Sequence, residues 1–474
     1  MNQIARVKCK QCERSFSDFQ KRCPYCGISR TKGGKHLAKS SKSGMGIVMF
    51  LLIFLAFLAI MGILAYRIFG GDTEQEVEYT PNDPPAIAQE QYPIVEDDKA
   101  EEYDAETALY PEPEPLEIKV QFAGDILLHR GPIDAARTGT NTYDFRPFLR
   151  DIKPFIDGDL ALVNMETPVD VLGENQDITT FPLFNAPFEI LEALDYAGFN
   201  HIVAANNHSF DRGFSGLVAT AANFERAGLD FTGIYVDAAA AAVPTIVDVG
   251  GIYVGIIAYT DSVNGLESLV PSEMLPYAVR RFRFDNLDSV PAMAEDIANL
   301  RAHGAEVVIV SLHWGAEYVD APTEMQRQIA RALAEQGADV IMGNHAHVIQ
   351  PIEWHYRPDG SRSLLIYSLG NFLADQTRLN PPIARTQFGK LVNLHIIREP
   401  DGTIRLDRCE VLPTLCMRDT SGNTLGIVDG ISVMPLFGGE LPDFVESTYL
   451  RDWGRRAYEH VTHIIGEEFI MQAP

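Results

Sequence analysis

The sequence predicts one large α/β domain that begins at Leu116, and three observations support this fold class. Short apolar runs typical of buried strands alternate with longer segments whose apolar residues recur at helical spacing. No internal repeat is visible, and no helical pattern indicates a simple bundle. Polar residues of the kind that form binding sites follow several of the apolar runs. Alternation of this kind is typical of apolar strands covered by helices.

The expected strands are short apolar runs rich in β-branched residues. In chain order they lie at 118–122 (IKVQF), 160–164 (LALVN), 201–204 (HIVA), 252–259 (IYVGIIAY), 307–312 (VVIVSL), 340–342 (VIM), 363–368 (SLLIYS) and 390–398 (KLVNLHIIR). The expected helices are longer and carry apolar residues three and four positions apart. In chain order they lie at 145–155, 187–197, 213–227, 290–302, 322–336 and, in the tail, about 444–465.

Charge is distributed unevenly along the 474 residues. The first 44 residues carry 11 basic and 2 acidic side chains, a net charge of +9, so the rest of the chain carries −35 to give the total of −26. A strongly acidic domain is repelled by a phosphate backbone. We therefore expect no nucleic acid partner.

Residues 44–66 (GMGIVMFLLIFLAFLAIMGILAY) contain no charged side chain. As a helix these 23 residues would extend about 34 Å, which is enough to cross a hydrocarbon core of about 30 Å. A cleaved signal peptide is the alternative, but the preceding segment is longer than a usual n-region and no A-x-A cleavage site is visible. We expect a single-pass protein of the cell membrane. The basic juxtamembrane segment at 31–43 predicts a cytoplasmic N-terminus and an extracytoplasmic main domain.

The N-terminal segment contains two CxxC pairs, formed by Cys9, Cys12, Cys23 and Cys26. Four thiolates at this spacing suit one tetrahedral structural Zn²⁺, which replaces the core that so short a segment cannot build. We expect a zinc ribbon at 1–30, and a redox-active CxxC pair or a disordered tail are the alternatives. Farther along the chain, Cys409 and Cys416 could form a disulfide, which the sequence leaves open.

Residues 67–115 are rich in Glu, Asp and Pro and poor in apolar side chains. Such a segment does not fold by itself, so we expect an acidic, proline-rich linker. The α/β domain is expected at 116–415. A C-terminal extension at 416–474 follows, and its helix either packs on the domain or forms a partner surface.

Polar residues of metal-binding type follow six of the expected strands. The carboxyl ends of strands in an open α/β sheet gather at one edge. Carboxylates, a carboxamide and imidazoles gathered there match two divalent cations such as Mn²⁺, Zn²⁺ or Fe. Each residue alone could instead cap a helix or satisfy a turn. The residues that carry this prediction are Asp125, Glu166, Asn207, His313, His345 and His347.

The stretch GNHAH at 343–347 directly follows an apolar strand. In an extended backbone, residues two apart point to the same side. We therefore expect His345 and His347 to aim both imidazoles at one point. A loop with two partly exposed histidines is the alternative.

Six motifs occur over roughly residues 117–412: GD at 124–125, NxE at 164–166, ANNHSFDRG at 205–213, LHWGAEY at 312–318, QGADVIMGNHAHVIQP at 336–351 and YSLGNF at 367–372. Together they resemble the CapA family of poly-γ-glutamate capsule synthesis proteins. That family is similar in fold to the calcineurin-like metallophosphoesterases. The resemblance implies a four-layer αββα sandwich with two metals at its edge.

The resemblance also implies how the ligands divide between the two metals. One metal would be held by Asp125 and His347, and the other by Asn207, His313 and His345. Glu166 would bridge them, and it stands where the phosphoesterase pattern has an aspartate. The usual D-x-H motif becomes Asp125-x3-His129 here, so His129 is a candidate substrate-binding residue instead of a ligand.

Further roles follow from the same motifs. His208 would be the general acid or a donor to a developing oxyanion, with Asp211 orienting its other ring nitrogen. Trp314 and Glu317 could shape the substrate pocket, although Trp314 could equally be a packing residue. Asn371 could bind substrate, hydrogen-bond a ligand histidine or cap its turn.

The leading hypothesis is a membrane-anchored CapA-like protein of the bacterial envelope. Its dinuclear-metal domain would act in synthesis, release or anchoring of an anionic polymer such as poly-γ-glutamate, by metal-dependent hydrolysis or group transfer. The acidic domain would repel a polyanion unless the cations and Arg280, Arg281 and Arg283 override the net charge at short range. The alternative is a non-catalytic scaffold that couples the cytoplasmic zinc ribbon to an envelope polymer synthase.

Overall fold

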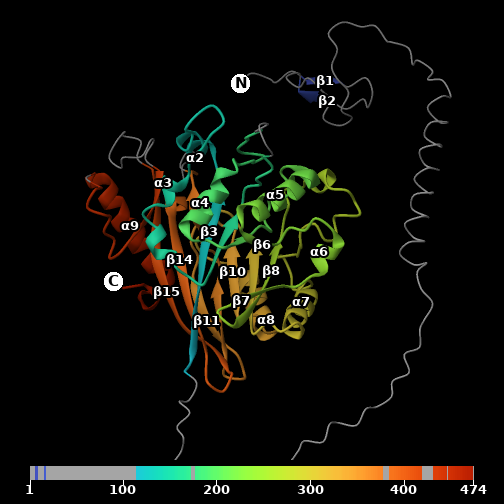
Figure 1. Cartoon of the computed structure of the whole chain (residues 1–474), viewed down its shortest axis with the longest axis vertical. Coiled ribbons are helices and arrows are strands. Elements are labelled where there is room, and N and C mark those ends of the chain that lie inside the picture. Colours follow the sequence, from blue (N-terminus) through green and yellow to red (C-terminus); the bar gives the residue numbers. More distant parts are fainter. Residues whose placement is uncertain are drawn as a thin grey trace, which may run out of the picture. The chain divides into compact units, whose positions relative to one another are not determined.

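The structure is a computed structural model (Figure 1), and it describes residues 6–8, 15–17, 114–171, 177–376, 384–418, 431–445 and 447–472. The chain divides into two compact units, Met1–Tyr103 and Asp104–Pro474. The described part of the first unit is one antiparallel pair, β1 (Arg6–Lys8) and β2 (Ser15–Ser17). The four N-terminal cysteines, the juxtamembrane segment, the expected membrane span and most of the linker lie outside the described residues.

Among the helices of the described residues, none is both long and apolar enough to cross a bilayer. The expected span at 44–66 is outside them, so it stays a prediction.

One sheet of the second unit has eight strands. They are β3 (Leu116–Leu127), β4 (Leu160–Met165), β5 (His201–Val203), β6 (Asp230–Thr232), β13 (Asn371–Ala374), β14 (Phe388–Arg398), β15 (Ile404–Arg418) and β16 (Ile431–Pro435). The path through the sheet is β16-β15-β14-β3-β4-β5-β6, and β13 pairs with the end of β3. Strands β3 to β6 are parallel, so their carboxyl ends lie at one edge.

The second sheet has six strands. They are β7 (Thr245–Val249), β8 (Ile252–Thr260), β9 (Val307–His313), β10 (Val340–Asn344), β11 (Ile352–Tyr356) and β12 (Arg362–Ile366). The order is β11-β12-β10-β9-β8-β7. Its four central strands are parallel, and antiparallel β7 and β11 close its two ends.

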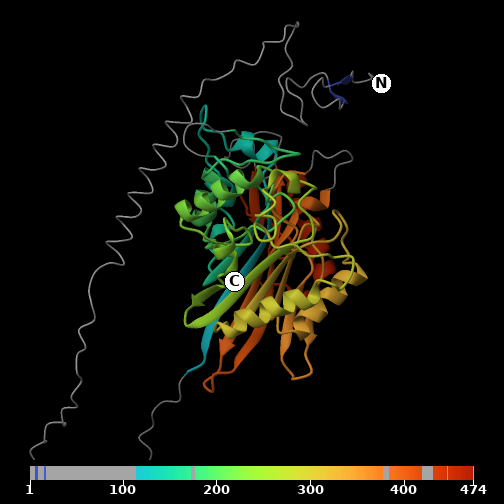
Figure 2. The same cartoon turned by 90° about the vertical axis from the view of Figure 1, so that its right-hand side faces the viewer.

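The two sheets pack face to face, with helices on both outer faces. The helices are α2 (Arg130–Ala135), α3 (Arg146–Leu149), α4 (Glu189–Ala197), α5 (Gly213–Ala227), α6 (Ala238–Ala242), α7 (Val290–Ala302), α8 (Glu324–Glu335) and α9 (Thr448–Ile465). Figure 2 shows the strands between the green helices α4 and α5 on one side and the yellow helices α7 and α8 on the other. This is the four-layer αββα arrangement that the resemblance implied.

Alternation along the strands explains the two cores of the sandwich. Val307 and Ile309 of β9 belong to the apolar cluster between the sheets, together with Phe122 of β3. Val308 and Val310 point the other way, into a separate cluster with α7 and α8. Strands buried on both faces read as continuous apolar runs, which is how the sequence revealed them.

Two expected boundaries differ from the structure. The helix expected at 145–155 is instead the short α3 and a 3₁₀ turn, Lys153–Phe155, because Pro154 has no backbone N–H to donate to a continuing helix. The domain end expected at 415 falls inside β15. The extension continues the same sheet through β16, and α9 packs on β14 and β15, so it is part of the α/β unit.

Cys409 and Cys416 are both buried free thiols on β15. They are seven positions apart on one extended strand, which separates their Cα atoms by roughly 23 Å, far beyond disulfide range. They do not pair with each other.

Candidate metal centre

Two groups of buried side chains meet between the carboxyl ends of the two sheets. One contains Asp125, Glu166 and His347, and the other contains Glu166, His313 and His345. Within each group the potential ligand atoms lie within 4.8 Å of one another. Glu166 belongs to both groups, so the arrangement has the form of a dinuclear site with a shared carboxylate.

Each of the two carboxylates is positioned by a strand end. Asp125 lies on β3, and its backbone N–H donates to Gly370 O at 3.0 Å. A Cβ at Gly124 would lie 1.8 Å from Gly370 O, so only glycine permits this approach. Glu166 follows β4 and donates its N–H to Ile126 O at 3.1 Å. The GD and NxE motifs therefore fix two neighbouring strand ends against each other.

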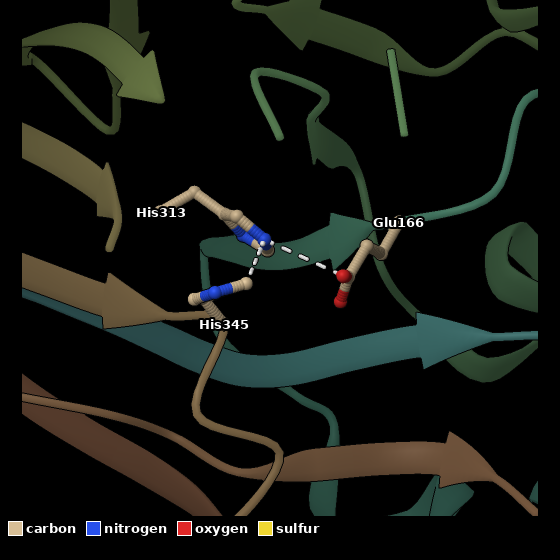
Figure 3. A group of neighbouring side chains, drawn as sticks. All are labelled: Glu166, His313 and His345. Carbon is tan, nitrogen blue, oxygen red and sulfur yellow. Dashed lines mark hydrogen bonds and ion pairs between the residues drawn. The ribbon is translucent and has the colours of Figure 1, made fainter. Parts of the chain in front are cut away.

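The second group gathers around His313, the last residue of β9. Figure 3 shows His345 and Glu166 both reaching the imidazole of His313. His313 Nε2 lies 3.1 Å from His345 Nδ1 and 3.4 Å from Glu166 Oε1. Asn207, in the loop between β5 and α5, places its Oδ1 2.9 Å from the same Nε2. A carboxamide oxygen therefore joins this group.

His347 occupies the corresponding place in the first group. Its Nδ1 lies 3.2 Å from Asp125 Oδ2 and 3.8 Å from Glu166 Oε2. It also donates to Asn371 Oδ1 at 3.0 Å. Asn371 is buried, and its amide nitrogen donates to Gln376 Oε1 and Thr386 O, both at 2.9 Å. All hydrogen-bonding groups of the Asn371 amide are therefore engaged within the protein. The amide orients His347, and the substrate-binding role that the sequence suggested for Asn371 is not supported.

The residues present fit divalent cations. Both oxygens of Glu166, Asp125 Oδ2 and Asn164 Oδ1 are buried without a hydrogen-bond partner among the residues described. Burying several carboxylate oxygens without hydrogen bonds is costly, even with histidines nearby. Oxygen and imidazole donors are the ligands that Mn²⁺, Zn²⁺ and Fe²⁺ accept. The surplus of acceptors around Glu166 therefore indicates a place for positive charge.

The pKa values of the site residues also reflect an excess of negative charge around Glu166 and Asp125. Burial, together with the charge of Asp125, raises the pKa of Glu166 to about 8. Burial alone would lower the pKa of His347, but Glu166 and Asp125 raise it to about 9. Burial lowers the pKa of His313 to about 3 and holds the pKa of His345 well below its ordinary value. His313 and His345 therefore stay neutral, with ring lone pairs free for a cation.

His345 and His347 do converge, but the reason expected from the sequence is wrong. Strand β10 ends at Asn344, and the two histidines have φ values of 92° and 57°, which place both in left-handed backbone. Their ring centroids are 6.1 Å apart. A looped backbone, held by a hydrogen bond from Tyr318 N to Ala346 O, aims the imidazoles and not the alternation of a strand.

A histidine–aspartate pair lies in the loop that supplies Asn207. His208 donates from Nδ1 to Asp211 Oδ2 at 2.7 Å, and both side chains are buried. The same carboxylate oxygen accepts from Phe184 N at 2.7 Å, and the Phe184 ring packs edge-on against His208 at 4.7 Å. This arrangement fixes the tautomer and leaves Nε2 as the nitrogen that can exchange a proton.

Three further residues were expected to bind substrate or shape its pocket, and they differ in exposure: His129, Glu317 and Trp314. His129 is partly exposed and packs against Phe184, and burial lowers its pKa to about 4. Glu317 is exposed beside Tyr318, whose pKa is raised by burial and by that carboxylate. Trp314 is not at the site. It is fully buried in the cluster under α7 and α8, and its indole donates to Tyr367 O at 3.1 Å.

Two residues that help to build the site, Asn164 and Phe184, were not predicted from the sequence. Asn164 donates to Asp125 Oδ1 at 2.7 Å and lies 3.5 Å from His313 Nδ1, so it links both groups. Its place two residues before Glu166 in NxE was the available signal. Phe184 could not be predicted from the sequence, because it lies in an irregular loop that no motif marks. Only the folded chain brings its ring next to His208.

Comparisons with known proteins agree with the motif resemblance. The family model described as bacterial capsule synthesis protein PGA_cap matches residues 119–376. The PGA biosynthesis protein CapA of Bacillus subtilis is 28% identical over 298 residues, which cover 62% of this chain and 71% of that protein. The capsule biosynthesis protein CapA of Bacillus anthracis is 27% identical over 294 residues, which cover 61% of this chain and 66% of that protein.

Two solved structures are similar at low sequence identity. A putative 5′-nucleotidase from Staphylococcus aureus in complex with α-ketoglutarate is 15% identical with a TM-score of 0.38, covering 65% of this chain and 57% of that one. The calcineurin-like phosphoesterase YfkN from Bacillus subtilis is 14% identical with a TM-score of 0.34, covering 73% of this chain and 99% of that one.

Proposed function

Because this chain belongs to the bacterial capsule synthesis protein family PGA_cap, we propose that its α/β unit is a metal-dependent hydrolase or transferase acting on an anionic envelope polymer. The polymer we propose is poly-γ-glutamate, and the step is its synthesis, release or anchoring. Support comes from two relatives that are named for PGA and capsule biosynthesis. The observation that carries the chemistry is Glu166, buried and shared between two ligand groups.

Two divalent cations, Mn²⁺, Zn²⁺ or Fe²⁺, would be held by the two groups. Asp125 and His347 would bind one, and His313, His345 and the Asn207 carboxamide would bind the other, with Glu166 between them. Bound cations would supply positive charge against the negative charge that develops on a phosphoryl or acyl group during transfer. The ligands already lie within coordination range, so little rearrangement is needed.

The chain's own residues would handle the proton. His208 would donate from Nε2 to the leaving group, while Asp211 keeps the ring in that tautomer through its 2.7 Å contact with Nδ1. Phe184 covers this pair on one side and limits access of water. His129 and Glu317, at the edge of the site, would contact substrate.

Binding of a polyanion has to overcome the acidic character of the domain. The sequence suggested that three arginines could offset the negative charge of the domain. Each of them is ion-paired: Arg280 with Asp296, Arg281 with Glu267 and Arg283 with Asp285. Their charge is largely neutralised locally, so the bound cations would supply most of the attraction at short range.

We further propose that the protein is anchored in the cell membrane by residues 44–66. The ribbon at 1–30, with Cys9, Cys12, Cys23 and Cys26 around one Zn²⁺, would be cytoplasmic, and the α/β unit would be extracytoplasmic. The partners would then be the membrane, the polymer and its synthase.

The test is metal analysis followed by turnover. The full chain, purified gently in detergent, is expected to contain about two divalent cations in the α/β unit beyond the ribbon zinc, and to cleave aryl phosphates or a γ-glutamyl polymer in their presence. His345→Ala should abolish turnover, whereas the matched control His303→Ala, an exposed histidine after α7, should not.

Two outcomes would count against this proposal. A protein that binds no divalent cation in the α/β unit refutes the metal centre. A protein whose His345→Ala variant fully restores polymer formation in cells acts as a scaffold that couples the ribbon to a synthase, and not as a catalyst.

A further inference from the structure

Lys390 is a fully buried lysine on β14. Its Nζ donates to Gln350 O at 2.7 Å. No carboxylate among the described residues lies within ion-pair distance of it, and burial lowers its pKa to about 7. An ammonium group is costly to bury without a counter-ion. Methionine would fill similar space without that cost, so what lysine contributes is the hydrogen bond to Gln350.

That hydrogen bond joins the two sheets next to the candidate metal centre. Lys390 belongs to the eight-stranded sheet, whereas Gln350 precedes β11 of the six-stranded sheet and lies three residues after His347. The backbone N–H of Gln350 donates to Ser368 O at 3.1 Å, and its side-chain amide donates to Val319 O at 2.7 Å. Gln350 is therefore fixed from three directions.

The segment fixed in this way, residues 345–350, needs external support. His345 and His347 both have positive φ, a strained backbone conformation for residues other than glycine that persists only where surrounding structure imposes it. Neither residue belongs to a strand. Support also comes from the Ser368 hydroxyl, which donates to Val348 O at 2.9 Å. From the eight-stranded sheet, Asp125 and Asn371 contact the His347 side chain, whereas Lys390 hydrogen-bonds the backbone of the segment, at Gln350 O.

The Gln350 side chain extends the same support to the edge of the site. Val319 directly follows Tyr318, whose N–H donates to Ala346 O at 2.8 Å. The loop that carries Glu317 and Tyr318 is thus tied to the histidine segment at both Ala346 and Gln350. Displacing the Gln350 carbonyl would loosen both loops together.

We propose that Lys390 is a positioning residue for the metal centre: through its hydrogen bond to Gln350 O it holds His345 and His347 in their left-handed conformation at coordination distance. The effect on metal binding rests on the function proposed above. The effect on the backbone of residues 345–350 does not, because it is a property of the metal-free protein.

The experiment compares Lys390→Met with Val392→Ala in the full chain. Val392 is buried on the same strand two residues away, so its side chain points to the same face, but it makes no contact with Gln350 that the structure describes. Mn²⁺ and Zn²⁺ affinities are measured by competition with a chelator. Amide hydrogen exchange of residues 343–351 is measured by mass spectrometry after metal removal.

Lys390→Met is expected to weaken metal binding by about 10- to 100-fold, as loss of a residue that orients ligands commonly does. It should also speed exchange in 343–351 about tenfold or more. Val392→Ala should change metal affinity less than threefold and leave exchange in this segment unchanged. A second variant, Lys390→Gln, keeps a side-chain N–H donor at this position without the charge. It should retain more metal affinity and slower exchange than Lys390→Met, and a loss of affinity and protection below those of Val392→Ala tests the hydrogen bond if Lys390→Met fails to fold.

The outcomes separate this inference from the proposed function. Parent protein that binds no divalent cation refutes the proposed function, and the exchange measurement then decides alone whether Lys390 holds the segment. Parent protein that binds metal, with Lys390→Met equal to it in both affinity and exchange, overturns the role of Lys390 and leaves the metal centre standing. Equal losses in Lys390→Met and Val392→Ala would also overturn it, since they would reflect general destabilisation.

Discussion

Binding of divalent cations to this protein should release protons at neutral pH. The metal-free site holds Glu166 with a pKa raised to about 8 and His347 with a pKa raised to about 9. Both groups are therefore mainly protonated at pH 7, but each must be deprotonated to bind a cation. Metal binding is consequently coupled to pH in a direction that the structure determines.

The magnitude follows from those two pKa values. At pH 7 a group with a pKa of about 8 is protonated in about nine molecules of ten, and one with a pKa of about 9 in nearly all. Glu166 and His347 lie close together and titrate as a pair, so we expect release of about one to two protons per molecule. Apparent affinity should then rise about tenfold to a hundredfold per pH unit near pH 7, and level off above about pH 10.

Calorimetric titration with Mn²⁺ in buffers of different ionisation enthalpy measures this number directly. Glu166→Gln should lower the release by about one proton and reduce the metal stoichiometry, because the shared carboxylate is lost. Glu295→Gln makes the same substitution at an exposed position on α7, outside both ligand groups, and should leave release unchanged. Tight metal binding at pH 7 with no proton release in the parent protein would refute the reasoning.

Three further substitutions test individual contacts. Asp211→Asn should lower turnover about 10²- to 10⁴-fold at unchanged metal content, because His208 loses the carboxylate that holds its Nδ1 proton; metal lost in parallel would contradict this. Asn371→Ala should weaken metal binding about 10- to 100-fold in a chelator competition, since His347 loses the amide oxygen that orients its ring; unchanged affinity would show that the amide is dispensable. Trp314→Phe should lower the free energy of unfolding in urea by about 1–3 kcal/mol and leave metal affinity within twofold; loss of metal would place the indole at the site after all.

The sequence predicted the central strands and their polar ends because both depend on local pattern. Runs such as 307–312 and 340–342 are apolar on both faces, which only strands covered on both sides tolerate. Parallel strands end at one edge, so the polar residues after them had to gather there. Glu166 and His313 were found in this way without any knowledge of pairing.

Edge strands and the C-terminal strands carried a weaker signal. Strand β7 is half-exposed along most of its length, and β13 has only four residues, so neither stands out from a loop. Strands β15 and β16 extend the large sheet from β14, which itself pairs with β3, a strand far earlier in the chain. Such pairing is decided by the whole fold and not by the segment itself.

Alternation could have placed Trp314 correctly. His313 lies on the face of β9 that carries Val307 and Ile309, toward the other sheet, and the next residue points to the opposite face. The motif LHWGAEY suggested that its members act together. The backbone separates them, with the imidazole in the site and the indole under the helices.

The backbone conformation of the two histidines in GNHAH could not be predicted from local sequence. Glycine is the residue that adopts positive φ without cost, and the chain uses it at Gly370 in the neighbouring loop. At 345 and 347 it carries imidazoles instead and accepts a cost of about 1–3 kcal/mol each. Contacts from Ser368 and Lys390, which are distant in sequence, impose this conformation. Since glycine would serve the fold better, the imidazoles at these two positions are what the proposed metal centre would account for.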